Sequence, residues 1–309
     1  MFTLIRTAVF TALFLLFCLT STTTQAAESQ SQYGPWVWGL SGGLVEQLDT
    51  DFSDAEGEMS VTRSFAQASL GYARDRNTTL SVSVGAGKTD YDFSPLATID
   101  GQQPWGKIEN YSVSVAIRFA PSDTTNVILI PSIRTLKESG ASSSAVRTQG
   151  IIGGISWKLS DTLTLGPGLG WFSGVGGGSN VFPIVVVDWK ITDKLSLNTG
   201  RGLAASQGPG LSLDYQLDDK WTLGLSGRFE KTRFSLDEST TASSSIGEDR
   251  SSPLVASVRY SPWPMTSVTL LAGVEFNGSL RLEDSNGRRL AQTDVDTAAI
   301  IGITFSSRF

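Results

Sequence analysis

Apolar and polar residues alternate one by one along many segments of this chain, and this alternation is the feature that most restricts its fold. It is clear in Leu80–Ala86, Tyr111–Phe119, Leu163–Trp171 and Val268–Phe276. A period of two places the apolar residues on one face of a β-strand and the polar residues on the other. No stretch carries the 3.6-residue apolar stripe of an amphipathic helix. The sequence therefore predicts an all-β protein.

Short and long connections alternate between the expected strands. The short ones are rich in Asp, Ser and Pro, which favour tight turns, and lie at 75–78, 121–125, 160–162, 192–194, 218–220 and 261–266. The long ones span 49–58, 94–107, 139–144, 174–180, 203–210, 238–252 and 283–289. Transmembrane barrels combine short periplasmic turns with long external loops. This predicts an antiparallel up-and-down barrel of about 14 strands, with 12 or 16 as alternatives, and both termini periplasmic.

The last ten residues form one more alternating segment. Phe309, Phe305, Ile303 and Ile301 share one face, and the chain stops on the aromatic residue. This segment resembles the C-terminal signature of bacterial outer-membrane β-barrels, although Ser307 stands where a hydrophobic residue is usual. The resemblance implies a location in the cell outer membrane, contact with its lipid and lipopolysaccharide, and recognition of the four apolar residues by the barrel assembly machinery. Over its mature length the chain looks like the uncharacterised porin-like, single-domain barrels of Gram-negative bacteria.

Residues 1–26 have the pattern of a secretory signal peptide, which leaves 27–309 as the barrel domain. Arg6 supplies the positive charge, 7–20 is apolar, and Thr24-Gln25-Ala26 offers small residues for cleavage. A lipoprotein anchor at Cys18 is the alternative, disfavoured because Phe17 is bulky. No later segment reaches the roughly 18 consecutive apolar residues of a transmembrane helix.

A secreted β-sandwich or propeller would show the same alternation, so a further signal has to separate it from a membrane barrel. Aromatic residues at the expected strand ends supply that signal, because membrane barrels carry aromatic girdles at both interfaces. These residues are Trp36, Trp38, Tyr72, Trp157, Trp171, Trp189, Trp221 and Tyr260. Pro167 and Pro183 interrupt apolar strands, and we expect bulges or strand ends there because proline lacks a ladder donor.

The polar face of the strands would line the lumen, and it is made mostly of Gly and Ser. These small side chains either leave room for water or allow the sheet to curve strongly, and the sequence leaves both open. The same face carries a few basic residues near the expected periplasmic ends. They form a possible basic ring that would favour anionic solutes, or they are neutralised by nearby acids: Arg118, Lys158, Lys190, Arg259 and Arg308.

Composition argues against catalysis and against nucleic acid as a partner. The chain has no His, and its one Cys lies in the leader, which removes Ser-His machinery and Cys/His metal sites. Its formal net charge is −6, whereas nucleic-acid binders are basic. An acidic stretch within 49–58 lacks the Ca²⁺-loop spacing. We therefore predict no catalytic, cofactor or metal site, and no enzyme.

Two functions remain. The first is a porin-like passive channel for small solutes. The second is a non-conducting barrel that acts in structure, adhesion or partner binding through its external loops. Specialised porins also fold a long loop into the lumen, and Ser94–Lys107 and Glu238–Ser252 are the candidates for such a constriction.

Overall fold

The computed structural model describes residues 35–75, 78–99, 101, 104–141, 147–175, 177–199, 210–237 and 246–309. The expected signal peptide and Cys18 lie outside these residues. The first strands are β1 (Trp36–Asp51), β2 (Glu58–Ala73), β3 (Thr79–Phe93), β4 (Lys107–Ser122), β5 (Thr125–Glu138), β6 (Arg147–Lys158), β7 (Leu163–Ser173) and β8 (Ser179–Lys190). The others are β9 (Leu195–Thr199), β10 (Gly210–Gln216), β11 (Trp221–Arg228), β12 (Glu230–Ser235), β13 (Ile246–Trp263), β14 (Thr266–Glu283), β15 (Arg289–Val295) and β16 (Ala298–Arg308).

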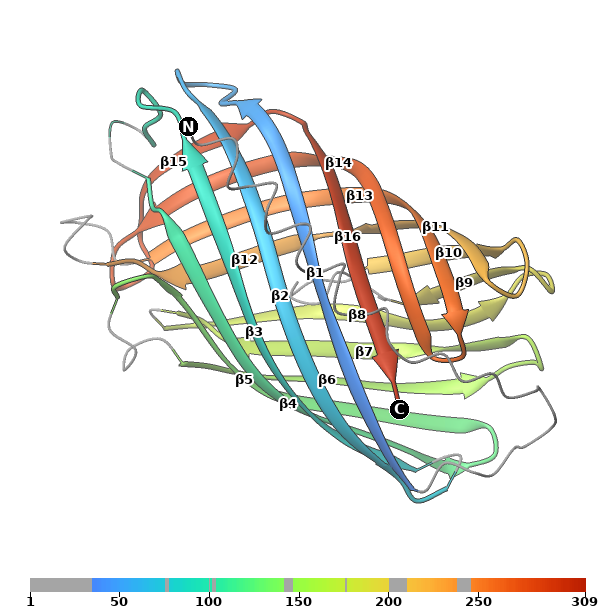
Figure 1. Ribbon diagram of the computed structural model, residues 1–309. Helices are drawn as coiled ribbons and strands as arrows, with labels where there is room; N and C mark the ends of the chain where they lie inside the picture. Colours follow the sequence, from blue (N-terminus) through green and yellow to red (C-terminus); the bar gives the residue numbers. More distant parts are fainter. Residues whose placement is uncertain are drawn as a thin grey trace. The chain divides into compact units, whose positions relative to one another are not determined.

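These sixteen segments form one sheet that closes on itself as an antiparallel 14-strand barrel, with one additional parallel bridge between β5 and β12 (Figure 1). There are sixteen segments but fourteen strands because two of the strands are interrupted. β11 and β12 form one strand, since both pair with β13, and β15 and β16 form another, since both pair with β14. β16 closes the sheet against β1, from Gly39↔Arg308 to Gln47↔Ile300. The backbones of Trp38 and Phe309 complete this seam with two hydrogen bonds of 3.0 and 2.8 Å.

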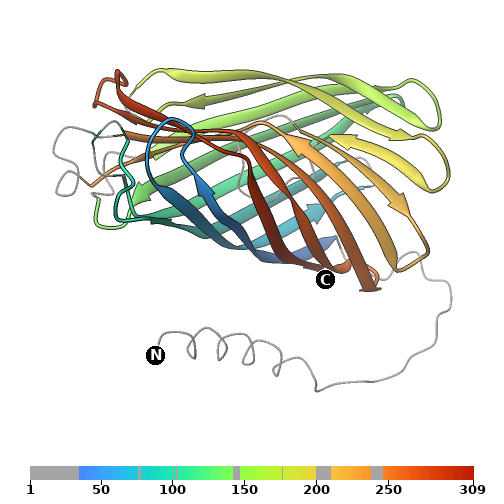
Figure 2. The same cartoon turned by 90° about the horizontal axis from the view of Figure 1, so that it is seen from above.

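The connections sort to the two ends of the barrel, as the sequence predicts (Figure 2). We call the end with the tight turns and Phe309 the short-turn end, and the opposite one the long-loop end. One predicted boundary is wrong: Ile246–Ser252 belongs to strand β13 and not to the preceding loop. These residues form a strand because they pair in register with both β12 and β14.

The outward face of the barrel is apolar. Leu40, Val82, Val113 and Leu270 expose 43–58% of their surface to the outside. Of the predicted girdle residues, all but Trp171 lie near the short-turn end, where ring pairs form between Trp36 and Tyr72 and between Trp221 and Tyr260. No helix that could span a membrane occurs among the described residues. A closed sheet with an apolar outer face is the form in which strands cross a bilayer, and this barrel has that form.

Both prolines lie inside strands, at places where pairing is incomplete. Pro167 sits where the β6–β7 ladder stops at Gly154↔Gly168 and resumes at Trp157↔Leu165. Pro183 lies in the half of β8 that has no described partner on the β9 side, because β9 pairs only with residues 188–190. Proline has no backbone N–H to donate, and both prolines therefore lie where fewer hydrogen bonds form between neighbouring strands.

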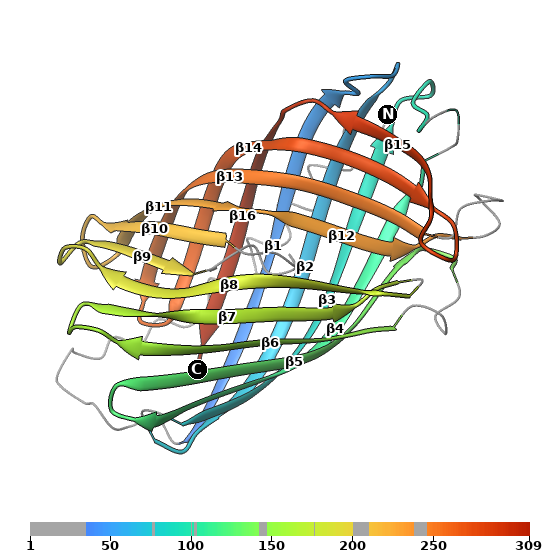
Figure 3. The same ribbon diagram turned by 180° about the vertical axis from the view of Figure 1, so that it is seen from behind.

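The barrel is pinched at the long-loop end. β12 pairs with β13 on one side, and on the other it meets β5 across the barrel, at Ser235↔Lys137. β9 and β10 are short and end well before the tip of β12 (Figure 3). At this end, therefore, β1–β5 and β12–β16 enclose an interior that is narrower than at the short-turn end. β6–β8 lie beside this interior and do not border it.

Candidate functional site: the barrel lumen

The lumen of the long-loop half is filled by an apolar core. Phe234, Ile99 and Leu282 are fully buried there, and Trp105 is 2% exposed. The wall strands on both sides of the pinch contribute most of this core, which we call the lumen core: Phe52, Met59, Val61, Ala97, Ile99, Trp105, Ile108, Leu136, Phe234, Leu236, Leu280, Leu282, Ala291 and Val295. Among the described residues, side chains packed in this way exclude water from the core itself.

The described residues of the β3–β4 connection, one of the two predicted constriction loops, enter the lumen. It buries Ala97, Ile99 and Trp105 in the lumen core. The Trp105 ring lies edge-on to Phe234 with centroids 4.9 Å apart, and to Tyr91 at 5.6 Å. Gly106 N donates a 2.9 Å hydrogen bond to Glu138 Oε1, which ties the connection to β5. The other candidate, 238–252, lies outside the described residues up to 245.

A charged layer lies next to the lumen core. Arg63 of β2 donates hydrogen bonds to Glu275 Oε2 at 3.2 Å and to Gln47 Oε1 at 3.3 Å, and its Nη2 is 3.9 Å from Asp249 Oδ2. The Tyr91 hydroxyl donates to the same Asp249 oxygen at 2.7 Å. Strands β1, β2, β3, β13 and β14 thus meet across the lumen in one polar network.

The short-turn half is more open and more polar. A cavity of about 280 Å³ lies among the ends of β8–β11 and β13. Its charged lining is balanced, with three basic and three acidic side chains: Lys190, Lys194, Arg259, Asp188, Asp193 and Asp214. This half can hold water and ions, and its balanced charge favours neither sign.

The five residues of the predicted basic ring all lie at inward-facing register positions near the short-turn end. Lys190 and Arg259 line the same cavity, where Arg259 is 3.7 Å from Asp214. Lys158 instead turns to Asp161, with Nζ 2.8 Å from Oδ1. Its hydrogen bond holds the pKa of Asp161 below the usual range. Arg118 pairs in register with Thr79, and Arg308 with Gly39. Two of the five cations are thus neutralised by acids.

The glycines of the inner face serve close strand packing at several positions. A Cβ on Gly166 would lie 1.9 Å from the Ile155 carbonyl oxygen, and one on Gly273 would lie 2.2 Å from that of Leu254. Backbone cannot move aside as a flexible side chain can. At these positions glycine permits curvature of the sheet and does not widen the lumen.

Gly273→Ala should therefore lower the free energy of unfolding by about 1–3 kcal/mol, the usual cost of forcing extra atoms into a packed site. Urea titration of the refolded barrel measures this loss. Gly71→Ala is the matched control, because its Cβ would meet nothing closer than Ser81 Cβ at 3.5 Å. Equal stability of the two variants would contradict the packing role of Gly273.

Among the described residues, no group of three or more acidic side chains is placed to hold a metal ion. In the acidic β1–β2 connection, Asp54 accepts hydrogen bonds from the Thr293 hydroxyl and from Asp294 N. This contact ties the connection to β15. The predicted lack of a catalytic or cofactor site stays a prediction.

Sequence reasoning missed the lumen core, although a signal for it exists. In β3 the apolar residues Leu80 and Val82 fall on even positions, whereas Tyr91 and Phe93 fall on odd ones. Such a switch of parity moves the apolar residues from the outward to the inward face along one strand. The same signal marks Met59 and Val61 in β2.

No family model matches the chain, and no curated protein matches it significantly. Solved structures with a similar fold include an outer membrane channel from Pseudomonas putida F1, with 8% identity, TM-score 0.49, and coverage of 92% of this chain and 100% of that one. A FadL homologue from Pseudomonas aeruginosa has 14% identity, TM-score 0.43 and 89% coverage of both chains. The P. putida toluene transporter TodX has 9% identity, TM-score 0.44, and coverage of 90% and 91%.

Proposed function

We propose that this barrel is an outer-membrane channel for small solutes that is closed at its long-loop end, with the β3–β4 connection as the movable part of the closure. The long-loop end would face the cell exterior and the short-turn end the periplasm. The observation that carries the proposal is the insertion of Ala97, Ile99 and Trp105 into a lumen that is polar and open at its other half.

The closed state would predominate at rest. Withdrawing the connection exposes Ile99 and Trp105, at roughly 2–3 kcal/mol for each side chain. Together these costs favour the closed state by roughly a thousandfold or more. Brief, rare openings are therefore expected without a stimulus.

The predicted basic ring belongs to this proposal in a weaker form. Arg118 and Arg308 would place positive charge at the short-turn mouth, whereas Lys158 and Arg259 have acidic partners. A modest preference for anions follows. Recognition of Phe309, Phe305, Ile303 and Ile301 by the assembly machinery also stays a prediction.

A non-conducting barrel is the second candidate, and one observation favours it. Most of the lumen core comes from the wall strands themselves, including Met59, Phe234 and Leu280. These side chains stay in the lumen if the connection withdraws, and they could keep it closed. The barrel would then act through its long loops.

Single-channel recording of refolded 27–309 in planar bilayers separates the two candidates. We expect rare steps from the natural sequence and frequent discrete steps after residues 94–106 are replaced by a short Gly/Ser connection. Replacement of 284–288 by Gly/Ser residues is the control, because none of these residues belongs to the lumen core. If all three proteins are silent while heat-modifiable migration shows them folded, the channel proposal fails. Continuous large conductance of the natural sequence would contradict the closure.

A further inference from the structure

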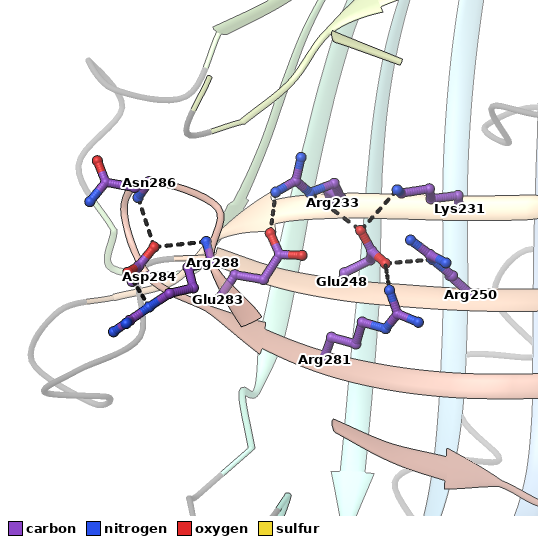
Figure 4. A network of polar contacts seen from close by, with 9 residues as sticks. All are labelled: Lys231, Arg233, Glu248, Arg250, Arg281, Glu283, Asp284, Asn286 and Arg288. Atoms are coloured by element: carbon purple, nitrogen blue, oxygen red, sulfur yellow. Dashed lines mark hydrogen bonds and ion pairs between the residues drawn. The ribbon is translucent and has the colours of Figure 1, made fainter. Parts of the chain in front are cut away.

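A second charged cluster lies on strands β12–β14 (Figure 4). Its residues alternate in register with Phe234 and Leu280 of the lumen core, so they occupy the opposite face of these strands. Its centre is Glu248, which is paired in register with Arg233 on one side and Arg281 on the other. Lys231 Nζ lies 3.1 Å from the Glu248 carboxylate, Arg233 Nε 3.4 Å, and Arg281 Nη1 3.6 Å. Arg250 Nε is 2.5 Å away. We call these residues the Glu248 cluster.

The cluster carries an excess of positive charge. Among the described residues, the four cations form ion pairs with Glu248 and, through Arg233, with Glu283. Four cations thus share two carboxylates. Arg281 Nε is buried and has no hydrogen-bond partner among the described residues, whereas Arg233 Nε and Arg250 Nε both face the Glu248 carboxylate. Bringing like charges together under partial burial is unfavourable unless a counter-charge balances them.

The cations of the cluster are exposed to solvent, whereas the Glu248 carboxylate is buried. The Glu248 side chain is 1% exposed, whereas those of Lys231, Arg233, Arg250 and Arg281 are 22–36% exposed. An anion that approaches from outside therefore meets the guanidinium and ammonium groups and not the carboxylate. Arginine presents paired donors that match the oxygens of a phosphate group.

The position of the cluster along the strands suggests where such a group comes from. Arg250 shares the outward face of β13 with Leu254, four residues away, which is 43% exposed. Four residues of strand span roughly 13 Å. Lys231 follows the 67% exposed Phe229 by two residues. The cluster therefore lies just beyond the exposed apolar side chains of β11 and β13, where lipid headgroups would lie if these side chains contact the hydrocarbon of a bilayer.

We propose that the Glu248 cluster is a binding site for a phosphate group, supplied by the headgroup of an outer-leaflet lipid or by a soluble phosphorylated solute. The site is independent of whether the lumen conducts. Lys231, Arg250 and Arg281 contact the phosphate oxygens, and Glu248 holds the three side chains in place from behind.

Calorimetric titration of the refolded protein in detergent tests this site with three probes: bis-phosphorylated lipid A, its dephosphorylated form, and pyrophosphate. We expect at least one phosphate probe to bind tenfold or more tightly than dephosphorylated lipid A. Binding of lipid A alone identifies a lipid headgroup as the source. Binding of pyrophosphate as well identifies a soluble phosphate. Failure of both phosphate probes to bind overturns the proposal.

Lys231→Gln/Arg250→Gln should weaken the binding at least tenfold. Lys107→Gln is the matched control, because Lys107 is also a cation at the long-loop end but pairs with Asp90 at 3.4 Å. The affinity of this variant for the phosphate probe should stay within twofold of that of the natural sequence. Should the double variant not fold, Lys231→Gln alone should weaken binding at least threefold. Unchanged affinity in a folded cluster variant contradicts the proposal.

Discussion

Phe234→Ala should lower the free energy of unfolding of the barrel by about 3–5 kcal/mol, the range for removing a buried aromatic ring. Phe234 is fully buried in the lumen core. Its ring packs against Trp105 and Tyr91, with centroids 4.9 and 6.3 Å away. It also fills the space beside Gly247, where a Cβ would lie 2.3 Å from the ring. No neighbouring side chain can easily fill the cavity, because the core is held by strands from both sides of the pinch.

Urea titration of refolded protein measures this loss, and Phe229→Ala is its control. Phe229 is 67% exposed on the outward face, one residue beyond the end of β11. Its removal loses apolar contact with detergent or lipid but leaves no internal cavity. We expect a smaller loss, of about 1–2 kcal/mol. Equal losses would mean that the lumen core is loosely packed. Phe234→Ala should also raise the frequency of channel openings, because the Trp105 ring loses its nearest aromatic partner.

Arg63→Met should lower the free energy of unfolding by about 3 kcal/mol, because it leaves two carboxylates without their cation. Glu275 and Asp249 have side chains that are only 8% and 15% exposed. Breaking a buried ion pair by removing one partner costs about 3–5 kcal/mol. We place the loss at the low end because the Arg63 side chain is 23% exposed, which allows water to reach the site.

The double variant Arg63→Met/Glu275→Met separates charge from shape. It removes one cation and one carboxylate together, so it should recover part of the stability that Arg63→Met loses. Lys88→Met is the control, because Lys88 and Asp90 form an exposed pair at 3.3 Å with both side chains 43% exposed. Such pairs contribute about 1 kcal/mol or less. A loss in Arg63→Met no larger than in Lys88→Met would contradict a stabilising role for the network.

Much of the fold could be predicted because its signals are local. Alternation along Tyr111–Phe119 defines an outward and an inward face whatever the rest of the chain does. Asp- and Ser-rich segments turn the chain tightly, as at 160–162, because their side chains hydrogen-bond to nearby backbone: Ser160 Oγ accepts from Thr162 N at 3.2 Å. Strand number, sheet order and the seam at Phe309 follow from such signals.

The candidate site could be predicted only in part. Alternation assigns the five basic residues to one face near one end of the barrel, but their partners do not follow from it. Asp161 and Lys158 are neighbours in sequence, whereas Asp214 and Arg259 meet because β10 and β13 both flank β11. Charge balance at the mouth therefore depends on strand order and curvature.

The sequence by itself determined a closed antiparallel barrel with an apolar exterior, since period and turn chemistry act over a few residues. Only the tertiary structure decided whether the lumen is open. β5 and β12 meet across the barrel at Lys137 and Ser235, about a hundred residues apart in the chain. Phe234 then packs on Trp105, and the opposite face of β12 carries the Glu248 cluster. These contacts depend on the cross-section of the whole sheet, which no local pattern encodes.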